Sequence, residues 1–355
     1  QASRRYPRII QTLIKLYLHY KILGISSLAK FQKILLAPYV TKLIGRSIQS
    51  FNVKGLEHLQ HNNSHLFLSN HRDIASDPML VDYALFDNNL ETVRIAIGDN
   101  LTNNPMIADL MRLNKSFIVR RSIEGGKEKL IALKHLSAYI HHSITQDSES
   151  VWMAHREGRA KDGIDKTDIA VLKMLYLHQR KQTSFADAMA ALNIIPVSIS
   201  YEYDPLIVAK ARELLAIEKT GNYEKTDTED EQSTIKGLTG YKRRVSVSFC
   251  PPITTEQANS PEELAAHLDT TIAAHQVIYP THHLAHVLLN EGTTSAAYQQ
   301  LKTQHPQQAQ YLAKHAENLS TDVYNKMLSI YTNIYTRAMQ YQNKPAIEYG
   351  AVANK

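Results

Sequence analysis

Residues Leu68 to Leu80 read LSNHRDIASDPML and follow a short apolar run that is typical of the end of a β-strand. His71 lies three residues after Leu68, with Asp73 two residues further on and Asp77 six residues beyond His71. A neutral imidazole accepts a proton near physiological pH, and a neighbouring carboxylate fixes its tautomer and stabilises the imidazolium. The stretch therefore predicts acid–base chemistry at a strand end, with either aspartate as the partner of His71.

A purely structural interpretation of the same residues is also open. Asp77 followed by Pro78 has the pattern of a helix N-cap with proline at the first helical position. In that interpretation His71 is a polar loop residue and Asp77 only caps the helix that follows.

Strand and helix patterns alternate outward from this stretch, from Phe51 to about Ile253. Apolar runs predict strands at 51–53, 65–69, 93–97, 116–120, 150–154, 194–200 and 245–249. Helical spacing occurs around 78–84, 127–143, 169–179 and 185–192. We therefore expect an α/β fold with a mixed, largely parallel central sheet flanked by helices, and with its chemistry in the loops at one sheet edge.

The sequence divides into three regions around this core. Residues 1–50 show helical spacing of apolar residues, and no acidic residue precedes Glu57. Residues 51–260 form the α/β core, in which 218–237 is so polar that we expect an exposed, mobile insertion. Residues 261–355 are rich in Gln and Ala and predict a helical C-terminal extension.

The basic N-terminal helices have two interpretations. An apolar stripe with a basic polar face lies well in a membrane interface, and it also packs as a cap on a core. The stripe would consist of Ile9, Leu13, Ile14 and Tyr17, and its cations would include Lys15, Lys21, Lys30 and Lys33.

The composition limits the chemical classes of partner that the protein is expected to bind. The 355 residues carry a formal net charge of +6, which favours an anionic partner such as a phospholipid surface or a phosphorylated substrate. Interleaved aromatic and basic residues are missing, so we do not expect nucleic acid binding.

Cys250 is the single cysteine, so an internal disulfide is excluded. No stretch reaches about 20 consecutive apolar residues, and lysines interrupt every candidate signal-peptide core.

Three further strand ends carry distinctive residues. NKSFIVRRS ends a strand with Arg120 and Arg121, and paired guanidinium groups suit a phosphate dianion. VWMAHREGRAKDG ends another with Arg156 and the run Glu157 to Arg159. NIIPVSISYEYDP is an apolar strand that contains Pro196.

Together these stretches resemble the motifs of the glycerolipid acyltransferase superfamily, over about Phe51 to Ile253. The first motif is His, four residues and Asp, flanked by Asn and Pro, and here Asn70, His71, Asp77 and Pro78 match it. The other motifs match in order at Phe117 to Arg120, at Glu157 to Arg159, and at Ile195 and Pro196. The chain departs from the pattern in three places: five residues separate His71 from Asp77, the glycine before Phe117 is missing, and no Thr precedes Arg159. These departures indicate a divergent branch.

The resemblance implies transfer of a fatty acyl group from a thioester to a hydroxyl of glycerol-3-phosphate or a lysophospholipid, with 1-acylglycerol-3-phosphate as the favoured acceptor. It implies His71 as general base and Asp77, or alternatively Asp73, as the carboxylate that orients it. The other roles that it implies are phosphate binding by Arg120, Arg121 and Arg159, acceptor binding by Glu157 and Gly158, and a pocket wall of Phe117 and Pro196.

The partners follow from the same resemblance. We expect acyl-CoA or an acyl carrier protein as co-substrate, no cofactor and no metal, and a peripheral location on the cytoplasmic side of a membrane. A catalytically silent lipid-binding protein on the same fold is the alternative, because the spacing of His71 and Asp77 is altered. His282 and His286 lie one helical turn apart, and we interpret them as a helical surface pair.

Overall fold

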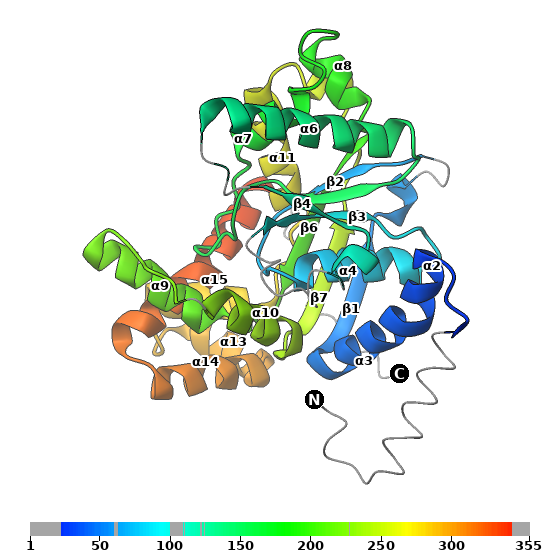
Figure 1. Cartoon of the computed structure of the whole chain (residues 1–355). Helices are drawn as coiled ribbons and strands as arrows, with labels where there is room; N and C mark the ends of the chain where they lie inside the picture. The colour runs from blue at the N-terminus through cyan, green and yellow to red at the C-terminus, as the bar shows by residue number, and fades with distance from the viewer. Residues whose placement is uncertain are drawn as a thin grey trace.

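The computed structural model describes residues 23–59, 63–99, 109, 111–120, 123, 125–226 and 228–342. Its centre is a seven-stranded sheet with the order β1-β7-β6-β2-β5-β3-β4 (Figure 1). Every neighbouring pair is parallel except β6 and β7, which are antiparallel. The bounds are β1 Ile48–Lys54, β2 Leu66–Ser69, β3 Arg94–Gly98, β4 Ser116–Val119, β5 Val151–Ala154, β6 Ile194–Tyr201 and β7 Arg243–Phe249. The predicted mixed, largely parallel α/β fold is confirmed.

Helices cover both faces of this sheet (Figure 1). In the central strand β2, Phe67 packs into the core beneath α3 and α4, whereas Leu66 and Leu68 pack into the core beneath the helices of the other face. A strand that is buried on both faces is apolar throughout, which explains the continuous apolar run before His71. The first face has α2 Leu28–Phe31, η2 Gln32–Leu36, α3 Ala37–Ser47 and α4 Ser76–Asp87, and the second has α6 Gly126–Thr145, α7 Ile169–Tyr176, α8 Phe185–Ala190 and α11 Pro261–Ala274.

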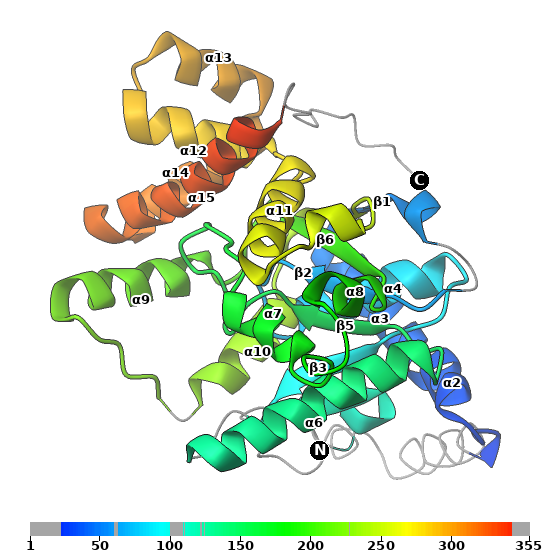
Figure 2. The same ribbon diagram turned by 90° about the horizontal axis from the view of Figure 1, so that it is seen from above.

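The C-terminal helices form a core of their own beside the sheet (Figure 2). The N-terminal turns of α9 join it through Ile207 and Ala211. Its centre contains the buried side chains of Tyr331, Met327 and Leu312. The helices are α9 Ile207–Thr220, α12 Pro280–Glu291, α13 Ala296–Gln304, α14 Pro306–Asn318 and α15 Thr321–Tyr341.

The polar stretch 218–237 differs from the expected mobile insertion. It contains the end of α9 and most of α10 Glu229–Thr239, and α10 packs against α3 and α4. Ser233 and Gly237 are the buried positions of α10, so this helix packs closely through small residues, while Glu231 and Lys236 are exposed to solvent. The sequence did not predict this helix, because it packs through small residues and therefore lacks the apolar stripe that marks most helices.

His282 corrects the interpretation of the two histidines. His286 is partly exposed, but His282 is completely buried, where Tyr279 N donates to its Nδ1 and its Nε2 donates to Tyr201 O at 3.1 Å. Burial lowers the pKa of His282 to about 3, so the ring is neutral. Its function in the fold is to supply a donor to a strand-end carbonyl.

None of the helices in the described part of the chain combines the length and the apolar character needed to cross a bilayer. Residues 1–22, which include Ile9, Leu13, Ile14 and Tyr17, lie outside the described residues.

Candidate active site

The loop after β2 brings His71 and Asp77 together. His71 Nδ1 donates to Asp77 Oδ2 at 2.9 Å, although five residues separate the two in sequence. The His71 side chain is 15% exposed and that of Asp77 is 0% exposed. Because Nδ1 is occupied, Nε2 is the ring nitrogen left for a substrate.

The Asp77 carboxylate receives four donors. Besides His71, the backbone N–H groups of Arg72 and Asp73 donate to Oδ2 at 2.6 and 2.9 Å, and Tyr201 OH donates to Oδ1 at 2.6 Å. Burial alone would raise the pKa of Asp77, but the hydrogen bonds and the charge of His71 together lower it. Asp77 is therefore an ionised, buried acceptor that holds the imidazole in one orientation.

Asp73 has a different position from the one that a base partner needs. Its Oδ1 accepts from Ala75 N and Ser76 N at 3.2 and 2.8 Å, so Asp73 stabilises the first turn of α4. Burial, followed by the charge of Asp77, raises the pKa of Asp73. The sequence pattern had assigned the capping position to Asp77, but α4 begins at Ser76 and Asp77 lies inside its first turn.

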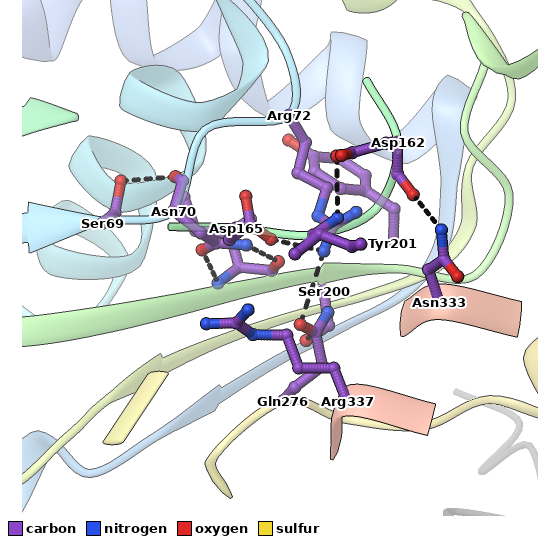
Figure 3. A network of polar contacts seen from close by, with 12 residues as sticks. Ser69, Asn70, Arg72, Asp162, Asp165, Ser200, Tyr201, Gln276, Asn333 and Arg337 are labelled. Atoms are coloured by element: carbon purple, nitrogen blue, oxygen red, sulfur yellow. Dashed lines mark hydrogen bonds and ion pairs between the residues drawn. The ribbon is translucent and has the colours of Figure 1, made fainter. Parts of the chain in front are cut away.

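Neighbouring residues fix the loop on both sides of His71 (Figure 3). The Asn70 amide donates to Ile199 O at 3.0 Å and accepts from Ile199 N at 2.8 Å, which joins the loop to β6. Arg72 forms an ion pair with Asp165 at 2.5 Å and so joins it to the loop between β5 and α7. Both side chains are buried, which makes the loop a rigid support for the histidine.

A cavity of about 570 Å³ opens in front of His71, where β3, β4 and β5 end. Six cationic side chains and three carboxylates line it among the described residues. This excess of positive charge suits an anionic substrate. The cations are Arg120, Lys129, Arg156, Arg159, Lys161 and Lys225, and the carboxylates are Glu157, Asp168 and Asp230.

The structure brings five of the ten predicted site residues to the wall of this cavity. Arg120 and the run Glu157 to Arg159 line it together with His71. Phe117 and Pro196 do not, so the predicted pocket wall is wrong. The Phe117 ring lies 4.9 Å from that of Tyr139, and Pro196 is buried within β6, beside β2. Arg121 lies outside the described residues.

Four cations of the cavity were not assigned a role from sequence. Arg156 and Lys161 share a loop with the recognised Glu157 to Arg159 run, so proximity to that motif was an available signal. Lys129 lies on α6 and Lys225 in the segment between α9 and α10. Only the fold brings these two lysines to the site.

Carboxylates from distant elements already balance part of the charge. Arg159, whose side chain is 8% exposed, lies 3.9 Å from Asp230 in the first turn of α10. Lys225 is 2.8 Å from the same carboxylate, and Lys161 pairs with Glu213 of α9. The cationic wall is therefore held by elements far away in sequence.

A second cavity, of about 230 Å³, adjoins the first and shares Ile74, Pro78 and Ile97 with it. Its walls are mostly apolar and come from η2, α3, α4 and β3. Polar side chains lie at one part of its wall, where Gln32 Nε2 donates to Asn114 Oδ1 at 2.9 Å and Asn114 Nδ2 donates to Asp82 Oδ2 at 3.3 Å. An apolar cavity of this kind suits a hydrocarbon chain.

Comparison with known proteins identifies the domain. Residues 50–200 match the family model Acyltransferase, and this segment contains all four motifs. A solved structure, the 1-acyl-sn-glycerophosphate (LPA) acyltransferase PlsC from Thermotoga maritima, is similar with a TM-score of 0.42 and 14% sequence identity, over 73% of this chain and 86% of that chain. No curated protein sequence matches the chain.

The matched segment is an acyltransferase domain, which supports an acyltransferase enzyme. The same segment contains the four motifs in which the chain resembles the glycerolipid acyltransferase superfamily.

Proposed function

We propose that this enzyme transfers a fatty acyl group from a thioester, acyl-CoA or acyl carrier protein, to a hydroxyl of a glycerol phosphate, with 1-acylglycerol-3-phosphate preferred over glycerol-3-phosphate. One observation carries the proposal: the buried His71–Asp77 pair lies where a cationic cavity adjoins an apolar one. A phosphate-bearing acceptor matches the first cavity, and an acyl chain matches the second.

In the proposed reaction His71 is the general base. Its Nε2 takes the proton of the acceptor hydroxyl as the oxygen attacks the thioester carbonyl carbon. The tetrahedral intermediate collapses, the C–S bond breaks, and the proton on His71 passes to the leaving thiolate. The ionised Asp77 stabilises the imidazolium that forms between these two steps.

The cationic side chains bind the acceptor phosphate in this proposal. Arg120 and Arg159 are the principal candidates, because guanidinium groups bind phosphate oxygens in pairs. Arg156 joins them from the same cavity, and Glu157, which also lines it, binds the remaining acceptor hydroxyl in this proposal. Arg121 keeps its predicted role as an additional phosphate ligand.

The proposed reaction takes place at a membrane surface, because both the fatty acyl chain of the donor and a lysolipid acceptor are poorly soluble in water. Lys30, Lys33 and Lys42 are exposed on the N-terminal helices, where each would contribute about 1 kcal/mol near anionic headgroups. A peripheral position on the cytoplasmic leaflet gives access to acyl thioesters. Flotation with anionic vesicles should therefore decrease as the salt concentration rises.

The test is an assay of the purified full chain with one acyl-CoA and each acceptor in turn. We expect thiol release that depends on the acceptor and is faster with 1-acylglycerol-3-phosphate. Thiol release that does not increase with either acceptor would contradict the proposal.

A further inference from the structure

The loop between β5 and α7, residues 155–168, carries Arg156, Arg159 and Lys161 into the cationic cavity. It has no helical or strand hydrogen bonding of its own. A loop of this length keeps one conformation only if other elements hold its backbone. The side of the loop that faces away from the substrate therefore matters for the geometry of the cations.

The last long helix, α15, packs against that side. Asn333 Nδ2 donates to Asp162 O at 2.9 Å, a contact that Figure 3 shows between the helix and the loop. Next in the chain, Gly163 has φ +82°, and a Cβ there would lie 2.4 Å from Ile330 O and 3.1 Å from Ile334 Cγ1. The glycine is thus required both by its backbone conformation and by its approach to α15.

Helix α15 is also connected to the ends of the loop 155–168, by way of Asp269 on α11. Arg337 lies 3.6 Å from Asp269 Oδ2, and Asp269 Oδ1 accepts from the backbone N and the hydroxyl of Thr167, each at 2.7 Å. The Thr167 hydroxyl also lies 3.0 Å from His155 Nδ1 at the start of the loop. Both ends of the loop and its middle are therefore tied to the C-terminal helices.

We propose that α15 is a positioning element for the anion-binding loop, and that Asn333 is the positioning residue that sets where Arg156 and Arg159 meet the acceptor phosphate. The inference rests on the proposed function for the identity of that phosphate. The physical reason is that phosphate recognition depends on geometry, so a small displacement of the loop weakens binding. The His71 ring is still held by Asp77.

The experiment compares Asn333→Asp and Asn333→Ala with Asn325→Ala in the full chain. Asn325 is exposed on the same helix and is the matched control. Loss of one hydrogen bond corresponds to about a two- to tenfold change in equilibrium. We expect KM for the acceptor to rise by that factor in both Asn333 variants, with KM for acyl-CoA and acyl-CoA hydrolysis without acceptor unchanged. Asn325→Ala should behave as wild type.

Hydrogen exchange of the loop amides is the second readout, and it does not depend on the acceptor. Both Asn333 variants, and Gly163→Ala from the loop side, should speed exchange within 156–163. If exchange there stays as in wild type, or if acyl-CoA hydrolysis falls as much as transfer, α15 does not position the loop. If exchange rises but the wild type transfers to neither acceptor, the positioning stands and the proposed function is wrong.

Discussion

The loop after β2 and the loop after β5 meet at one cavity, but they are held in different ways. The first is fixed from within the α/β core. There Asp77 has no exposed surface, and its carboxylate accepts a hydrogen bond from the Tyr201 hydroxyl of β6. The second is joined to the first through Arg72 and Asp165, and it is also held from outside the sheet, by α15 behind it and by carboxylates of α9 and α10 beside its cations. The proposed base is thus part of the folding core, whereas the proposed anion-binding wall is an assembly of distant elements.

This difference has a chemical consequence. A base that is oriented by a buried, ionised carboxylate needs no help from the substrate. Cations that are already paired with Asp230 and Glu213 have to share those partners with an incoming phosphate. We therefore expect substitutions in the first loop to lower the rate for every acceptor, and substitutions in the second to affect mainly acceptor binding.

The largest effect is expected for His71→Ala. Removal of the base should lower kcat by about 10²–10⁴-fold, and KM for acyl-CoA should change little. Thiol release at saturating acceptor measures it, with the thermal unfolding temperature as a check on the fold. Retention of more than about a tenth of the wild-type rate would exclude the general-base role.

The next largest effect on kcat is expected for Asp77→Asn, and this variant distinguishes the role of Asp77 from that of Asp73. The variant keeps the shape but loses the charge that orients and stabilises the imidazolium, so kcat should fall about 10²–10⁴-fold. Asp73→Asn is the matched control and should cost far less rate, because Asp73 accepts from backbone N–H groups of α4. If Asp73→Asn has the larger effect on kcat, the partner of the base is Asp73.

Substitutions in the cationic wall should have smaller and selective effects. For Arg120→Ala and Arg159→Ala we expect kcat/KM for the acceptor to fall about ten- to a hundredfold, the loss of a charged hydrogen bond worth about 1.5–3 kcal/mol. KM for acyl-CoA should change much less. Arg180→Ala, at an exposed position outside the cavity, is the control. Equal losses for both substrates would mean that these arginines stabilise structure instead.

The smallest effect on the rate is expected at Asp82, in the wall of the apolar cavity. Burial raises the pKa of Asp82 to about 7, so the folded protein keeps a proton that the unfolded chain releases near pH 4. Its contribution to stability is present below that pH and is lost as the pH rises to about 7. At about 1.4 kcal/mol per pKa unit, the change amounts to a few kcal/mol.

Asp82→Asn should remove this part of the pH dependence of the free energy of unfolding. Denaturant unfolding between pH 4 and 8 compares the two proteins. An identical slope in the wild type and in the variant would show that Asp82 titrates normally.

Local sequence patterns were sufficient to predict the strands of the central sheet. Each of the seven strands lies at a predicted apolar run, and the signal is clearest where a strand is buried on both faces, as in β2. His71, Arg120 and Arg159 were found as residues at strand ends, and parallel strands bring their ends together at one edge.

Long-range packing explains what the sequence did not show. Lys225 and Asp230 belong to a polar stretch whose helix is buried through Ser233 and Gly237, so hydropathy gave no sign of it. His282 looked like a surface residue because the strand-end carbonyl of Tyr201 that it satisfies is distant in sequence. Pro196 matched a motif, yet its strand lies between β2 and β7, away from the cavity.

The central claim is that His71 and Asp77 act as one unit, while the cationic wall acts separately. Double-mutant cycles of kcat/KM for acyl transfer test it directly, with His71→Ala and Asp77→Asn as one pair and Asp77→Asn and Arg159→Ala as the other. We predict that Asp77→Asn adds almost nothing once His71 is absent, and that the effects of Asp77→Asn and Arg159→Ala multiply. Multiplying losses in the first pair would contradict the account.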